Sequence, residues 1–244
     1  MKRSILLLAL CAMIFAFAPA ALASDPCVVP DDGSGTVTMP PEGCGYISPD
    51  RFHAIVNGLP PGTTIIVKPE HGWFVCNGGR GGRQERGCTI GGTPETGETE
   101  EFESTVRLTL SGAGGPLDGY TRTLDVPATV RTKVGPRKPG QPVQSFQTEM
   151  LSIEGEVVGD HDFAYLKISG GSESGIPSPG ETTLSYAGNG KWHVDSKFEV
   201  GYNITFEGAA GSLLEGSGGT TTGSVSMSAV AGPDADNADV HPQR

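Results

Sequence analysis

Three arginines stand close together in a chain that is otherwise acidic. Arg80, Arg83 and Arg86 lie in the glycine-rich segment CNGGRGGRQERGC, between Cys76 and Cys88. Guanidinium groups donate paired hydrogen bonds to carboxylate, sulfate or phosphate, and glycines let an anion approach the backbone. The chain has 28 acidic and 17 basic side chains, a formal charge of −11. The cluster is predicted to bind an anionic surface polymer or an extracellular protein. The alternative is a hairpin tip that balances the acidic run at 95–101.

A second group with chemical potential is the segment GDHDF, which holds Asp160, His161 and Asp162. Calcium takes six to eight oxygen ligands, so two carboxylates at a turn are candidate Ca²⁺ ligands, and the histidine extends the choice to a transition metal. The segment lacks the ladder of ligands found in an EF-hand. The alternative is an ordinary turn before a strand, and no other cofactor is implied.

Catalytic patterns are weak. His193 and Asp195 share one face of a predicted strand near a serine, which suggests a catalytic triad. No G-x-S-x-G, H-E-x-x-H or phosphate-binding loop is present, however. A pair of distant carboxylates could still hydrolyse a glycan, with Trp73 or Trp192 stacking on a sugar. We therefore expect a non-catalytic surface, matrix or ligand-binding module, and the alternative is a secreted hydrolase acting on glycan.

The N-terminus and the cysteines indicate export. Lys2 and Arg3 precede an apolar run and an Ala-Leu-Ala site, which together predict a signal peptide over residues 1–23. The remaining cysteines, Cys27, Cys44, Cys76 and Cys88, allow three pairings. We favour Cys27–Cys44 with Cys76–Cys88, because each pair closes a short loop. The destination is periplasmic or extracellular. The acidity argues against nucleic acid as a partner, and no later segment is long and apolar enough to span a membrane.

Glycine, threonine and alternating hydrophobic residues predict an all-β fold. Phe198, Val200, Tyr202, Ile204 and Phe206 alternate with polar residues over 197–207. A similar alternation covers Phe102 to Leu110, and includes Val106 and Leu108. Both stretches run into small-residue turns built around a leucine, and similar Pro/Gly turns precede them at 57–64 and 174–183. We therefore predict two tandem antiparallel repeats, packed as a sandwich with pseudo-twofold symmetry.

The predicted boundaries follow from this repetition. Repeat 1 covers residues 24–134 and includes the disulfide loop, and repeat 2 covers 146–231. The Pro/Gly-rich stretch at 135–145 is the linker, since it cannot form a helix or a central strand. The tail at 232–244 has no hydrophobic periodicity and is predicted to be disordered.

The segments GPRKPGQPVQSFQTEM (135–150), GIPSPGETT (175–183) and VDSKFEV (194–200) resemble a group of uncharacterised exported bacterial proteins. The resemblance covers residues 58–230, and implies an exported protein rich in β-structure. It implies no activity and no site residue. The chain departs from the group at His161, where the resemblance leads us to expect proline.

Overall fold

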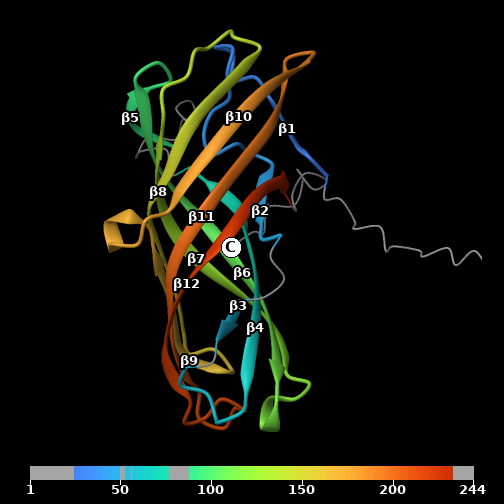
Figure 1. Ribbon diagram of the computed structural model, residues 1–244, viewed down its shortest axis with the longest axis vertical. Coiled ribbons are helices and arrows are strands. Elements are labelled where there is room, and N and C mark those ends of the chain that lie inside the picture. Colours follow the sequence, from blue (N-terminus) through green and yellow to red (C-terminus); the bar gives the residue numbers. More distant parts are fainter. Residues whose placement is uncertain (1–24, 50–52, 56, 77–87, 233–244) are drawn as a thin grey trace, which may run out of the picture.

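The described chain is all-β. The computed structural model describes residues 25–49, 53–55, 57–76 and 88–232, and the other residues are drawn as a thin grey trace (Figure 1). The predicted signal peptide and residues 233–244 of the predicted tail lie outside the described residues. All strand pairings are antiparallel, which confirms the predicted fold class. Within the described residues no helix has the length and hydrophobicity of a membrane-spanning segment.

The first half of the chain contains seven of the strands. They are β1 (Cys27–Pro30), β2 (Cys44–Ile47), β3 (His53–Ile55), β4 (Thr64–Val75), β5 (Thr89–Thr93), β6 (Gly97–Ala113) and β7 (Thr121–Val134). The second half contains β8 (Val143–Val158), β9 (Phe163–Gly170), β10 (Pro179–Gly188), β11 (Lys191–Gly208) and β12 (Gly218–Ala231). Short 3₁₀ turns, η1 (Gly115–Leu117) and η2 (Ser172–Ser174), interrupt the chain after β6 and β9.

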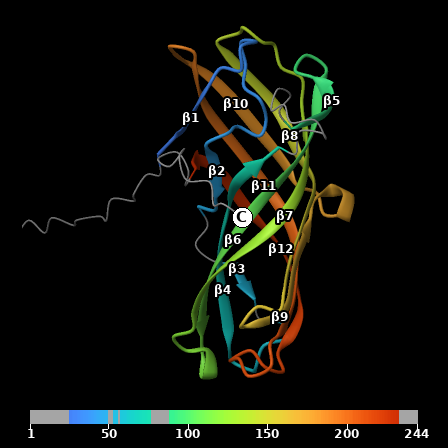
Figure 2. The same ribbon diagram turned by 180° about the vertical axis from the view of Figure 1, so that it is seen from behind.

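The strands form one sheet that closes on itself. Its pairings run β4–β2–β12–β11–β10–β8–β7–β6 and return from β6 to β4. Beyond the end of β10, β9 takes the position between β8 and β11 and pairs with both strands. The two views from opposite sides show long, tilted strands around a narrow interior (Figures 1 and 2). Because strands from both halves join one sheet, the predicted sandwich with pseudo-twofold symmetry is not confirmed.

Alternation along the strands places apolar side chains in the interior, as the sequence predicts. On β6, Phe102, Val106, Leu108 and Leu110 are all buried. On β11, Val200, Ile204 and Phe206 are buried, whereas Phe198 and Tyr202 are half-buried and pack against the same core. Each fully buried side chain of this kind contributes roughly 1.5–3 kcal/mol.

Two hairpins share the local structure that the repeated sequence predicts. Leu117 caps the β6–β7 hairpin and Leu214 caps the β11–β12 hairpin, and both side chains are fully buried. A side chain at Gly112 or Gly208 would clash with the carbonyl oxygen of the capping leucine. Both hairpin turns lie at the same end of the molecule (Figures 1 and 2). The two hairpins thus share a buried capping leucine and a glycine that its carbonyl approaches closely.

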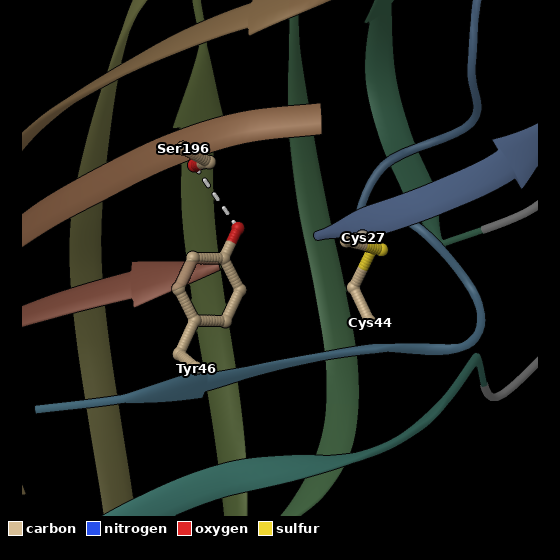
Figure 3. The surroundings of a disulfide bond; sticks show 4 residues. All are labelled: Cys27, Cys44, Tyr46 and Ser196. Carbon is tan, nitrogen blue, oxygen red and sulfur yellow. Dashed lines mark hydrogen bonds between the residues drawn. A yellow bond between two sulfur atoms is a disulfide. The ribbon is translucent and has the colours of Figure 1, made fainter. Parts of the chain in front are cut away.

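Both favoured disulfides are present, Cys27–Cys44 and Cys76–Cys88. The first joins β1, which pairs with β11, to β2, which pairs with β12. Beside it, Tyr46 extends from β2 toward β11 and donates a hydrogen bond to Ser196 Oγ at 3.1 Å (Figure 3). Burial raises the pKa of Tyr46, and the Ser196 bond offsets only part of this rise. The disulfide and this bond fix one end of the wall formed by β2 and β12.

Candidate functional site

The interior of the closed sheet contains an apolar cavity of about 60 Å³. Its walls come from seven strands, β3, β4, β6, β8, β9, β11 and β12. Aliphatic side chains make up most of the lining, among them Val67, Ile153, Ile168, Ile204 and Val225. These residues occupy the inward positions of their strands, so the same alternation that builds the core also makes this space apolar.

A second apolar cavity of about 40 Å³ adjoins the first. His71, Met150, Val200 and Met227 line both cavities, so they form the partition between them. Tyr46, Phe74 and Phe102 are among the side chains around the second space. Methionine side chains are unbranched and adaptable. The two cavities are therefore separated by side chains that can rearrange, and not by backbone.

His71 is the buried titratable group at this partition. Its Nε2 lies 2.9 Å from Ser104 Oγ, and that hydroxyl donates to the carbonyl oxygen of Ala128 at 3.3 Å. Which of the two groups donates in the His71–Ser104 contact depends on the tautomer of the His71 ring. Burial lowers the pKa of His71 to about 4, so the ring is neutral at pH 7.

Tyr202 and His53 lie at the side of the first cavity. The hydroxyl of Tyr202, on β11, is 3.3 Å from Nδ1 of His53, on β3. The two rings meet edge to face, with centroids 6.1 Å apart. Both residues are half-buried, and burial raises the pKa of the Tyr202 hydroxyl. This pair therefore combines a cavity-lining position with partial access to solvent.

The carboxylates of the predicted metal site, Asp160 and Asp162, already make other contacts. Asp160 Oδ2 accepts a hydrogen bond from Arg122 Nη2 at 2.7 Å, and Asp162 Oδ2 accepts one from the Tyr120 hydroxyl at 3.2 Å. Asp162 Oδ2 also lies 3.6 Å from Arg122 Nε. Burial opposes ionisation of Asp160, but the Asp162 amide and Arg122 outweigh it and lower its pKa.

His161 is 81% exposed, and its Nδ1 lies 3.0 Å from Asp162 Oδ1. Across the described residues, no group of three or more His, Cys, Asp or Glu side chains is arranged to hold a metal. The structure thus brings Asp160, His161 and Asp162 together around an arginine, which already supplies the positive charge there. Calcium binding at this turn stays a prediction.

The arginine cluster, Arg80, Arg83 and Arg86, falls outside the described residues. The Cys76–Cys88 disulfide that closes its loop is present. Anion binding by this loop therefore stays a prediction too.

The fold does not bring the remaining candidate residues from the sequence together into one site. Trp192 is only 2% exposed and its Nε1 donates to Asp31 Oδ2 at 2.9 Å, so its proposed stacking on a sugar is wrong. Trp73 is half-buried, and the guanidinium carbon of Arg107 lies 4.3 Å from the centre of the Trp73 ring. His193 and Asp195 are exposed, whereas the nearby Ser196 is buried and bonded to Thr182 and Tyr46. Ser196 thus points away from the predicted triad partners.

Sequence reasoning missed one buried ionic cluster. Glu98 and Glu100 point inward from β6, and Arg137 binds Glu98 from the linker segment. Burial and the neighbouring Glu98 raise the pKa of Glu100 to about 7, against smaller opposing effects of Thr89 and Arg137. The sequence did contain a signal for this cluster, because Glu98 and Glu100 lie on the same face of the alternating strand as Phe102. Neither cavity described above is lined by these carboxylates.

Comparison of the chain with protein-family models, with curated proteins and with solved structures finds no match.

Proposed function

We propose that the protein is an exported, non-catalytic binding protein that holds a small apolar molecule inside its closed sheet. The observation that carries this proposal is the pair of adjoining apolar cavities, with their adaptable methionine partition. Binding sites for small molecules are typically concave and mostly apolar, with a few polar groups at defined points. In the first cavity those groups are His71, His53 and Tyr202.

Binding fits the residues better than hydrolysis does. A glycan hydrolase needs two carboxylates that face the substrate. The described residues that line the two cavities include no carboxylate. The two disulfides are consistent with an oxidising compartment outside the cytoplasm.

Xenon binding tests the proposal, because this gas enters dry apolar cavities. Chemical shifts of ¹²⁹Xe in exchange with the protein should show saturable uptake. Val225→Phe, which adds bulk to the cavity wall, should abolish it. Val143→Phe is the matched control, since Val143 is 59% exposed on the outer surface. If Val225→Phe does not fold, Val225→Leu adds one methylene to the same wall and should reduce uptake. Uptake that is absent from the wild type, or unchanged in a folded Val225 variant, would refute the proposal.

A further inference from the structure

Among the described residues, the wall has a stretch between β3 and β12 that is without ladder pairing. β2 pairs with β12 only from Ser228 to Ala231. Further along this edge, Gly218 donates a backbone hydrogen bond to Gly58, and Asn57 Nδ2 donates one to the carbonyl oxygen of Thr220. Between these points, the described part of β3 pairs with β4 and not with β12. The first cavity lies directly inside this stretch, since His53, Val225 and Met227 all line it.

The Tyr202 side chain spans this stretch between β3 and β12. Tyr202 is opposite Gly223 in the β11–β12 register. A Cβ atom at Gly223 would lie only 2.8 Å from the Tyr202 hydroxyl oxygen. Because Gly223 has no side chain, Tyr202 lies across the inner face of β12 and reaches His53 on β3. Among the described residues, one hydrogen bond and one ring contact with His53 hold this rotatable side chain across the side of the cavity.

The shape and lining of the interior indicate what would enter. The two small cavities lie one after the other along β11, where Phe198 lines the second, Val200 lines both and Ile204 lines the first. Displacement of Met150 and Met227 would join them into a narrow space, which fits an extended chain better than a compact ring. A polar partner is available beside the entrance. Thr221 lies two residues before Gly223 in the same inward-facing row, and its buried hydroxyl has no hydrogen-bond partner among the described residues.

We propose that the interior takes the tail of an unbranched aliphatic molecule with a small hydrogen-bonding head, which enters between β3 and β12 when Tyr202 leaves His53. This inference rests on the proposed function and specifies its ligand class. The tail displaces the Met150 and Met227 side chains and occupies both cavities. The head stays near Thr221, Tyr202 and His53, which can donate or accept hydrogen bonds.

Calorimetric titration with primary alcohols from 1-butanol to 1-octanol tests the ligand class. Affinity should rise by roughly fourfold for each added methylene group as more apolar surface is buried. Cyclohexanol has the same number of carbons as 1-hexanol but a compact shape. It should bind roughly fifteenfold more weakly, because about two methylene groups would lose their contacts. Equal affinity for the two six-carbon alcohols, or no increase with chain length, would overturn the inference.

Two variants test the entrance. Tyr202→Phe removes the hydroxyl but keeps the ring, and should speed both association and dissociation of 1-octanol. Gly223→Ala displaces the Tyr202 side chain and should do the same. Gly91→Ala on β5 is the matched control, because a Cβ there meets nothing within 4 Å. Unchanged rates in a folded Tyr202→Phe protein would refute entry by this route.

The two proposals fail in distinguishable ways. Xenon uptake without alcohol binding would refute the ligand class and leave an interior that binds small apolar guests. Loss of both would refute the proposed function as well.

Discussion

Arg137 and Glu98 form a buried ion pair in which Arg137 Nη1 lies 2.5 Å from Glu98 Oε2. The guanidinium also donates to Thr36 Oγ1 at 3.0 Å and to the carbonyl oxygen of Val37 at 3.1 Å. One side chain thus connects the segment after β7, the loop between β1 and β2, and strand β6.

The first prediction follows from this pair. Arg137→Met should lower the free energy of unfolding by about 3–5 kcal/mol, because the charge of Glu98 would remain buried without its partner. Arg131→Met is the control, since Arg131 is 36% exposed in its pairing with Glu173 and should cost at most about 1 kcal/mol. Urea denaturation measures both. Equal losses would show that the Arg137 contacts contribute no more than surface pairing.

The second prediction concerns pH. The pKa of Glu100 is about 7 in the folded protein, against an ordinary value of 4.5. The folded state therefore holds a proton that the unfolded state has released between these values. The contribution of Glu100 to the free energy of unfolding is full below about pH 4.5, and falls as pH rises toward about 7, by up to about 3 kcal/mol. Glu100→Gln should remove this decline, which denaturation at several pH values would show.

The third prediction has the opposite sign. The pKa of His71 falls to about 4 from an ordinary 6.5, because burial disfavours the charged ring. The unfolded state binds a proton first, so stability is lost as pH falls from about 6.5 to about 4, again by up to about 3 kcal/mol. In the wild type this loss and the Glu100 effect oppose each other. Glu100→Gln should therefore be more acid-sensitive than the wild type, and His71→Gln less so. A common pH profile for all three proteins would contradict both assignments.

The fourth prediction uses neighbouring leucines. Leu214 is fully buried under the β11–β12 hairpin, whereas Leu213 is 57% exposed. Leu214→Ala should cost about 2–5 kcal/mol through lost burial and a residual cavity. Leu213→Ala should change stability by no more than about 0.5 kcal/mol. Thermal and urea unfolding of the two variants make the comparison, and similar costs would be evidence against a capping role for Leu214.

The fifth prediction concerns the first disulfide, which closes a sequence separation of 17 residues. Replacing Cys27 and Cys44 together by serine should lower the free energy of unfolding by about 3 kcal/mol, since the unfolded chain gains freedom. Amide exchange should also increase in β1, whose Cys27 pairs with Val194 on β11. Unchanged exchange in β1 would mean that its pairing with β11 holds without the disulfide.

The sequence by itself determined the fold class and most of the core, and it favoured, among three possible disulfide pairings, the one that the structure contains. Period-two alternation places one set of side chains on one face of a strand, so Val106, Leu108, Ile204 and Phe206 could be assigned to the interior without coordinates. Local loop closure was enough to select Cys27–Cys44 and Cys76–Cys88. These features depend on residues near one another in the chain, or on an intrinsic property of a strand.

Only the tertiary structure decided how the strands close and what lies inside. The pairing of β6 with β4 and of β12 with β2 joins residues far apart in sequence, and alternation is the same in an open, stacked or closed sheet. Tyr202 illustrates the point. The inward direction of its side chain could be predicted from the sequence. Its contact with His53, however, joins residues 149 positions apart in the chain and needs the space that glycine leaves at position 223. Arg137 lies in a segment that was predicted to be a linker. Its burial could be recognised only from the fold, which places Glu98 beside it.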